Sequence, residues 1–306
     1  MTVRLDLRLA GPGGEPVDLV RTLNSHGFAD LAPMRLDEAA GTLALTVRVP
    51  AGRPRRVVVG RGRGRHASVE ILGPGTPGTR TQAAVLEGVR HVLRMDEDLS
   101  AFYAACLDDP DLAWAAAGAG RMLRGPTVFE DVVKTICTTN CTWSATVRMV
   151  NALVGELGDP ASGGEGPLAN AFPTPERMAD APESLYRETV RAGYRSAYLI
   201  ALARSVADGG LDLEALGAAS REELSDEDLE AQLLALPGVG PYAAAHIMMT
   251  VGRHSRLILD SWTRPKYARL VGRKTVADAT IRRRFRRFGP DAGLAFWLFV
   301  TRDWVE

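Results

Sequence analysis

Hydrophobic and polar residues alternate with a period of two in the first quarter of the chain. This alternation, or a short apolar run with strand composition, occurs at residues 3–9, 43–49, 57–59 and 69–72. A period of two predicts half-buried strands, and a GPGG segment between the first runs predicts a turn. We therefore expect residues 1–80 to form an antiparallel β-sheet domain, closed by the GPGTPGT segment at its end.

From Gln82 onward the apolar residues recur with helical spacing, and strand-like runs disappear. Residues 160–176 form a loop rich in Gly and Pro that divides the helical part without marking a new fold. The pattern predicts an α+β fold, with the sheet first and a mainly α-helical body over residues 81–306.

One helix in this body has a well-defined start. Leu229, Leu233 and Leu236 lie at i, i+4 and i+7, which is one face of an amphipathic helix. Ser225 and Asp228 have capping-box spacing, so the helix is expected to begin between them.

The segment LPGVGPY that follows this helix is the most informative motif of the chain. A Pro-Gly pair ends the first helix, and a Gly-Pro pair suits the start of a second helix that ends at Gly252. The N–H groups at such a helix start can hold a phosphate, because glycine does not block its approach. We predict that the hairpin over residues 226–252 grips a nucleic-acid backbone through Leu236, Gly238, Val239 and Gly240; a tight turn with no ligand is the alternative.

A single acidic residue follows the next apolar run. Asp260 comes directly after a Leu-Ile-Leu stretch, within residues 253–270. It is either the N-cap of a helix or a functional carboxylate, and the two roles are compatible. Pro265 lies too deep for a regular helix that starts at Asp260, so we expect an irregular start.

Composition limits the remaining function classes. The chain of 306 residues has no apolar run near the ~18 residues of a membrane span and no signal-peptide pattern, so we expect a cytoplasmic protein. Three cysteines, Cys106, Cys137 and Cys141, are too few for a four-cysteine cluster and are expected to be buried thiols. We expect no cofactor and no metal ion bound by cysteines.

Charge is balanced overall but concentrated locally. The formal net charge is zero, which argues against DNA binding through bulk electrostatics. Basic residues gather at residues 53–66 and 282–287, and either stretch could follow a phosphate backbone, although a solvated face is the favoured interpretation of the first. Only three of the 37 basic residues are lysine: Lys134, Lys266 and Lys274.

Several blocks in order resemble the helix-hairpin-helix DNA glycosylase superfamily. They are the hairpin with Asp260, VFEDVVKTICTTNCTWSATVRMVNALVGELG (128–158), RAGYRSAYLIALARSV (191–206) and FGPDAGLAFWLF (288–299). The family includes endonuclease III, adenine glycosylase, 3-methyladenine glycosylase II and 8-oxoguanine glycosylase. The chain is most similar to the branch formed by the last two, and that branch also carries an N-terminal sheet.

The resemblance implies that Asp260 is the catalytic carboxylate. Cleavage of an N-glycosidic bond builds positive charge on the sugar, which a fixed anion stabilises. Some relatives use a hairpin lysine as a nucleophile and cleave the strand. Tyr242 stands at that position here, so we expect a monofunctional enzyme that leaves an abasic site.

The resemblance also implies that a damaged base is flipped from double-stranded DNA into a pocket. Asn140 matches the asparagine that faces the resulting gap, with a helix-terminal asparagine as the alternative. Aromatic candidates for the pocket, each with a core-packing alternative, are Tyr242, His246, Trp262 and Phe296.

The choice of base is the least determined expectation. Tyr242 and Phe296 stand where the 8-oxoguanine enzyme has a lysine and a glutamine, so alkylated purines are favoured. The alternatives are a thymine or uracil mispair enzyme, an 8-oxoguanine enzyme, and an inactive lesion-binding protein. The family further implies a monovalent cation at the hairpin carbonyls, a monomer, and a bacterial protein associated with the nucleoid.

Overall fold

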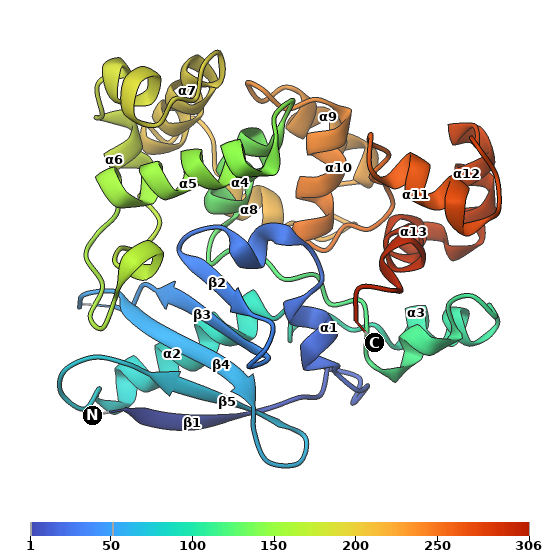
Figure 1. Ribbon diagram of the computed structural model, residues 1–306, viewed down its shortest axis with the longest axis horizontal. Coiled ribbons are helices and arrows are strands. Elements are labelled where there is room, and N and C mark those ends of the chain that lie inside the picture. The colour runs from blue at the N-terminus through green and yellow to red at the C-terminus, as the bar shows by residue number, and fades with distance from the viewer. Residues whose placement is uncertain (1, 51, 306) are drawn as a thin grey trace.

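The computed structural model describes residues 2–50 and 52–305 and has the expected α+β architecture (Figure 1). Its five antiparallel strands are ordered β1-β5-β4-β3-β2. The strands are β1 (Val3–Arg8), β2 (Met34–Asp37), β3 (Thr42–Val47), β4 (Arg55–Arg61) and β5 (His66–Ile71). All four strand-like runs predicted from the sequence are confirmed.

One face of the sheet is buried by helix α2 (Thr79–Val92). Leu43 pairs with Val59, and Val59 pairs with Val69, so these buried residues form a row across three strands. Val85 and Val89 of α2 belong to the same hydrophobic cluster. The core that contains the sheet therefore extends past residue 80, because the strands bury their apolar face against the first helix of the body.

The segment between β1 and β3 contains structure that periodicity did not reveal. Helix α1 (Leu19–Leu23), a 3₁₀ turn at Gly27–Asp30 and strand β2 are each five residues or shorter, too short to show a repeat. His26 and Phe28 lie in this segment, and Phe28 packs in the cluster of the helical body. The N-terminal part thereby contributes residues to the body's interior.

The helical body consists of two groups of helices with α10 (Pro241–Thr250) between them (Figure 1). Ile247 and Met248 of α10 belong to one hydrophobic cluster, whereas Met249 belongs to the other. Tyr242 packs against both clusters. The start of α10 therefore lies where the two groups meet, which places the hairpin at their junction.

The remaining helices of the body are α3 (Ser100–Leu107), α4 (Val128–Thr138), α5 (Trp143–Leu157), α6 (Pro175–Ala179), α7 (Arg195–Ala207), α8 (Leu213–Ala218), α9 (Asp226–Leu234), α10 (Pro241–Thr250), α11 (Thr263–Leu270), α12 (Asp278–Phe285) and α13 (Ala292–Thr301). Within the described residues, none of the helices combines the length and hydropathy required to span a bilayer.

Candidate functional site

Helices α9 and α10 form the predicted hairpin. The Ser225 hydroxyl accepts a hydrogen bond from the Asp228 N–H at 3.0 Å, which fixes the start of α9. Gly238 has φ +80°, and a Cβ there would lie 2.7 Å from the Tyr198 ring, so this position requires glycine. No side chain caps α10 at Gly240. The N–H groups of its first turn therefore remain available to an external acceptor.

Asp260 holds the start of α11 through one carboxylate oxygen. Its Oδ1 accepts hydrogen bonds from the N–H groups of Trp262 at 2.8 Å and Thr263 at 2.6 Å. The helix proper begins at Thr263, which places Pro265 in the first turn, where proline is tolerated. The irregular start predicted from the sequence is confirmed. The N-cap of α11 is Trp262 rather than Asp260, and Asp260 bonds the N–H groups of this N-cap and of the first helical residue. Oδ2 accepts no hydrogen bond from the described part of the chain, which leaves it free toward the adjoining cavity.

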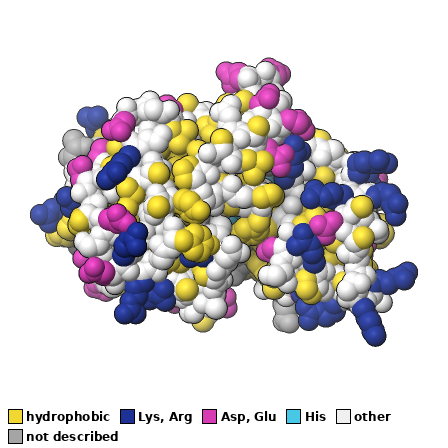
Figure 2. Space-filling model, turned by 90° about the horizontal axis from the view of Figure 1, so that it is seen from above, with side chains coloured by type: hydrophobic (Ala, Val, Ile, Leu, Met, Phe, Trp, Pro, Cys, Tyr) yellow, Lys and Arg dark blue, Asp and Glu magenta, His cyan; other side chains and the backbone are white. Residues whose placement is uncertain are grey.

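A cavity of about 1190 Å³ separates the hairpin from the α4–α5 turn and Asp260. Figure 2 shows a hollow among hydrophobic side chains on the face that carries the hairpin. Residues that line the cavity include His26, Phe28, Thr138, Asn140, Cys141, Trp143, Tyr194, Tyr198, Gly238, Val239, Gly240, Tyr242, His246, Asp260, Trp262, Trp297 and Trp304. It thus gathers three of the four predicted pocket residues and Asn140 beside Asp260.

An aromatic cluster forms the inner wall of this cavity. The Tyr242 and His246 rings are stacked, with centroids 6.1 Å apart and 23° between their planes. Phe28 lies edge-on to His246 at 4.8 Å, and His26 lies edge-on to it at 5.5 Å. The Tyr242 hydroxyl is 3.5 Å from the Thr138 hydroxyl. Burial raises the pKa of Tyr242, and the negative charge of Asp260 adds to this effect, so the phenol stays neutral.

Both histidines of the cluster are neutral. Burial lowers the pKa of His246 to about 3 and that of His26 to about 4. His26 accepts a hydrogen bond from the Phe28 N–H at Nδ1, and its Nε2 faces the Leu123 carbonyl, which assigns the proton to Nε2. The Nδ1 of His246 is buried without a partner among the described residues. Its Nε2 is also unbonded but accessible from the cavity.

Asn140 projects from the turn between α4 and α5. It is exposed, lines the cavity and has φ +45°, a left-handed conformation that asparagine tolerates better than most residues. Arg195 of α7 holds the preceding residue: its guanidinium donates to the carbonyl oxygen of Thr139 and, at 3.3 Å, to the Thr139 hydroxyl. Arg195 is only 6% exposed. The turn that carries Asn140 is therefore fixed from a separate helix.

Exposed aromatic side chains surround the cavity mouth. Within the described chain, the large aromatic residues with exposed side chains all line this cavity: Trp143, Tyr194, Tyr198, Trp262 and Trp304. Trp262 and Trp304 form a cluster with Trp297, with ring centroids 5.4 to 6.1 Å apart. Solvent-exposed rings favour a stacking partner, because water is a poor environment for their faces.

Sequence reasoning missed several of these residues. His26 and Phe28 lie about 200 residues before the hairpin, in a segment too short for periodicity to assign. Trp297 stands in the 288–299 block but was not distinguished from its apolar neighbours. Only the aromatic character of these residues was visible, and that is equally typical of a core.

The structure differs from the sequence-based predictions for Phe296 and Cys141, and it gives the packing of Leu236. Phe296 does not line the cavity: it is fully buried and packs edge-on against Phe285 at 5.5 Å, because α13 is apolar on every side. Cys106 and Cys137 are buried as expected, but Cys141 is exposed at the α4–α5 turn, so that prediction was wrong. Leu236 packs half-buried against the helical core, and its carbonyl accepts from the Val239 N–H.

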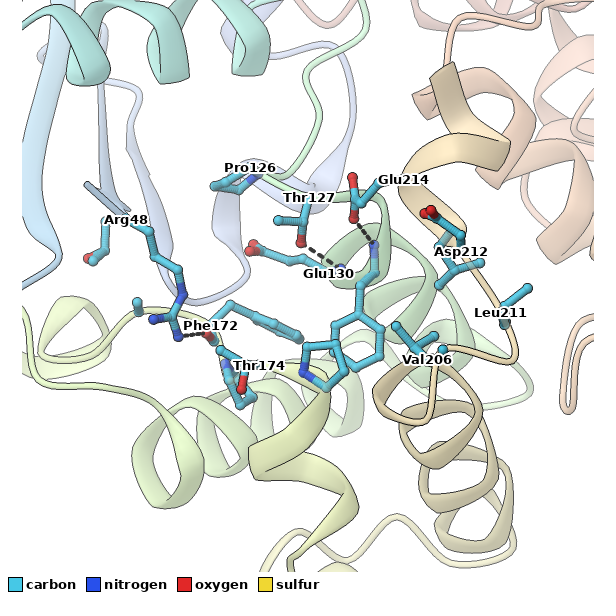
Figure 3. Close-up of a pocket in the computed structure, with 17 residues that line it drawn as sticks. Arg48, Pro126, Thr127, Glu130, Phe172, Thr174, Val206, Leu211, Asp212 and Glu214 are labelled. Atoms are coloured by element: carbon cyan, nitrogen blue, oxygen red, sulfur yellow. Dashed lines mark hydrogen bonds between the residues drawn. The ribbon is translucent and has the colours of Figure 1, made fainter. Parts of the chain in front are cut away.

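A second cavity, of about 400 Å³, lies among the starts of α4, α6 and α8 (Figure 3). Its acidic residues are occupied structurally: Glu214 accepts from two N–H groups at the start of α4, and Asp212 caps α8. Glu130 bonds Lys134 at 2.6 Å. Lys134 is fully buried and so is not an available nucleophile. Lys266 is paired with Asp303, and none of the three lysines lines the larger cavity.

Comparison with known proteins agrees with this geometry. The family described as "HhH-GPD superfamily base excision DNA repair protein" matches residues 133–293. A Saccharomyces cerevisiae protein named N-glycosylase/DNA lyase is 24% identical over 215 residues, covering 68% of this chain and 56% of the relative. A Mycobacterium tuberculosis protein named probable bifunctional transcriptional activator/DNA repair enzyme AlkA is 31% identical over 163 residues, covering 52% of this chain and 31% of the relative.

The chain therefore spans about half or less of the length of these curated relatives. A solved structure described as 3-methyladenine DNA-glycosylase from Archaeoglobus fulgidus superposes with a TM-score of 0.71 at 20% identity. The match covers 99% of each chain. At this identity, the likeness establishes the shared fold across both parts of the molecule.

Proposed function

The chain belongs to the HhH-GPD superfamily of base excision DNA repair proteins, and within it we propose that this protein is a monofunctional DNA glycosylase. Its substrate would be a damaged base flipped out of double-stranded DNA, and its product an abasic site. The observation that carries the proposal is the placement of Asp260 on the wall of the aromatic cavity that the hairpin also lines, with Oδ1 anchored and Oδ2 free of hydrogen bonds from the described residues.

The geometry of Asp260 matches what N-glycosidic hydrolysis requires. As the bond to the base breaks, positive charge develops on the sugar, and a carboxylate fixed by two backbone N–H groups stabilises it without reorganising. Oδ2 can also orient or deprotonate the attacking water. The free N–H groups at the start of α10 would hold the DNA backbone meanwhile.

Among the described residues, none of the three lysines lines the cavity, which favours hydrolysis over strand cleavage. A lyase step through a Schiff base requires an amine at the sugar. Tyr242 occupies the hairpin position and is neutral, and Lys134 is buried in an ion pair. The mechanism proposed here therefore uses water as the nucleophile.

The cavity wall favours an electron-poor alkylated purine. Neutral, electron-rich rings such as Tyr242 stack well on a base that carries positive charge. On the aromatic inner wall, His246 Nε2 is a polar atom that could read a base edge, and no glutamine is among the described residues that line the cavity. The second candidate is a thymine or uracil mispair enzyme, favoured by the tyrosine at the hairpin. Recognition of 8-oxoguanine is a third.

The remaining expectations come from the family resemblance. We expect a monomer located with the nucleoid in a bacterial cytoplasm. A monovalent cation at the hairpin carbonyls also remains a prediction.

A lesion panel tests the proposal. Duplexes that carry an alkylated purine, a uracil or thymine mispair, or 8-oxoguanine are incubated with enzyme and then treated with alkali. We expect alkali-dependent cleavage at the alkylated purine. Absence of an alkali-labile site on every duplex would overturn the glycosylase assignment, and nicking without alkali that is trapped by borohydride would overturn the monofunctional assignment.

A further inference from the structure

Positive charge is concentrated on the segment that follows Asp260. Residues 261–289 contain ten Lys and Arg but one acidic residue, Asp278, although the whole chain has zero net charge. The remainder of the protein is correspondingly acidic. The segment covers α11, α12 and the 3₁₀ turn Arg286–Asp291 up to Gly289.

Four of these ten cations are bound within the protein. Arg264 pairs with Asp278 at 2.8 Å, Lys266 pairs with Asp303, and Arg284 and Arg287 pair with Asp109. The other six are exposed and make no ion pair with any described residue. We call them the basic surface: Arg269, Arg273, Lys274, Arg282, Arg283 and Arg286.

The basic surface is held on a rigid support. Ile281, Phe285 and Phe288, at i, i+4 and i+7, are buried in the hydrophobic cluster of α13. This apolar stripe turns Arg282 and Arg286, one helical turn apart, toward solvent. Like charges held this close repel one another, so the arrangement costs free energy until a polyanion neutralises it.

The basic surface lies on the segment that directly follows Asp260 and Trp262 of the cavity wall. Helix α11 begins three residues after Asp260, and its N-cap Trp262 lines the cavity. In Figure 2, Lys and Arg side chains gather on the right of the face that carries the hollow, where α11 and α12 lie in Figure 1.

The other basic stretch has similar charge but a different position. Arg61, Arg63 and Arg65 are exposed and make no ion pair with a described residue. They lie at the β4–β5 turn, at the bottom of the view in Figure 1, whereas the hairpin helices lie at the top. The two stretches are alike in charge and exposure. They differ in their position relative to the hairpin, which lines the cavity.

We propose that the basic surface binds the phosphate backbone of duplex DNA on the Asp260 side of the flipped base, and that the arginines of the β4–β5 turn do not. This inference rests on the proposed function and extends it to the path of the DNA. The contacts are independent of sequence, since the six side chains present point charges and forks to phosphate rather than a base-reading element in a groove. They add to the phosphate grip of the hairpin.

Salt dependence of binding tests this path. Each phosphate contact steepens the slope of log K against log salt concentration by about 0.9 for duplex DNA. The triple variant Arg282→Ala/Arg283→Ala/Arg286→Ala should therefore lower the slope by roughly 2 to 3 on an undamaged duplex. Arg61→Ala/Arg63→Ala/Arg65→Ala removes the same charge and is the matched control, with an unchanged slope expected.

The outcomes separate the two proposals. If both triple variants lower the slope equally, net charge alone explains the effect and the proposed path is wrong. An unchanged slope for the Arg282/Arg283/Arg286 variant would also overturn the inference, because the basic surface would then not bind DNA. Single-turnover excision by saturating wild-type enzyme tests the proposed function independently. If the wild-type enzyme excises a lesion but the Arg282/Arg283/Arg286 variant has an unchanged salt slope, only the proposed path of the DNA is wrong. If the slope is lowered but no lesion is excised, only the glycosylase assignment is wrong.

Discussion

Asp260 and Thr263 are joined by two reciprocal hydrogen bonds. The Thr263 N–H donates to Asp260 Oδ1 at 2.6 Å, and the Asp260 N–H donates to the Thr263 hydroxyl at 2.9 Å. This pair resembles a capping box and fixes the carboxylate before any substrate arrives. One oxygen therefore serves the fold while the other is available for chemistry.

Asp260→Asn separates these two roles. Asparagine caps helices about as well as aspartate, so the free energy of unfolding should change by less than about 1 kcal/mol. The negative charge is lost, and the single-turnover excision rate should fall about 100-fold or more. Thermal unfolding and excision of an alkylated duplex measure the two effects. If excision by Asp260→Asn is unchanged, Asp260 serves only to hold the start of α11. If the wild-type protein binds lesion DNA but does not excise the base, the protein is a lesion-binding protein and not an enzyme.

The two glycines of the hairpin should respond differently to alanine. Gly238→Ala places a side chain at φ +80° against the Tyr198 ring and should destabilise the protein by about 1 to 2 kcal/mol. Gly240 has φ −102° and open space around its Cα, so Gly240→Ala should leave stability nearly unchanged. Its methyl group would instead obstruct a phosphate at the start of α10 and weaken DNA binding. Similar binding by wild type and Gly240→Ala would exclude this phosphate site.

Acid should destabilise the protein through its buried histidines. His26, His91 and His246 have folded-state pKa values of about 4, 4 and 3, below the value of about 6.5 in an unfolded chain. Their contribution is fully present above pH 6.5 and is lost as the pH falls toward 4, because the unfolded state binds the protons. Each contributes up to about 1.4 kcal/mol per pH unit in that window.

Asp131 opposes this effect. Its buried carboxyl has a pKa of about 7, so it favours the folded state as the pH falls from 7 toward 4. Denaturant unfolding between pH 4.5 and 7.5 measures the net slope, and His246→Gln should reduce the acid sensitivity. An identical pH profile for this variant would show that His246 is not held neutral in the folded state.

Arg195 should act on DNA through Asn140. Arg195→Met removes the hydrogen bonds to Thr139 and releases the left-handed turn, so binding to a lesion duplex should weaken by about tenfold. Asn140→Gly is the comparison, since it removes the side chain and glycine tolerates the left-handed conformation of the turn. Fluorescence of 2-aminopurine at the flipped position reports base extrusion, and both variants should lower it. If the 2-aminopurine fluorescence of Arg195→Met equals that of the wild type, Arg195 contributes only to packing and not to base extrusion.

The sequence by itself determined the elements that depend on local pattern. Period-two alternation located the strands, the capping-box pair and the Gly-Pro turn located the hairpin, and the carboxylate after the apolar run located Asp260. These signals are local, because capping, turn geometry and amphipathicity are properties of a few neighbouring residues. The missing hairpin lysine was visible in the same way.

Only the tertiary structure decided which aromatic residues face the cavity. His26 and Phe28 join Tyr242 and His246 from a distant segment, whereas Phe296 is buried in the support of α12. The structure also separated parts of the two basic stretches: α11 and α12 lie beside the hairpin helices, whereas the β4–β5 turn lies at the opposite end of the view (Figure 1). An aromatic or basic residue has the same local signature in either place, because burial and position depend on contacts that the chain makes over long separations.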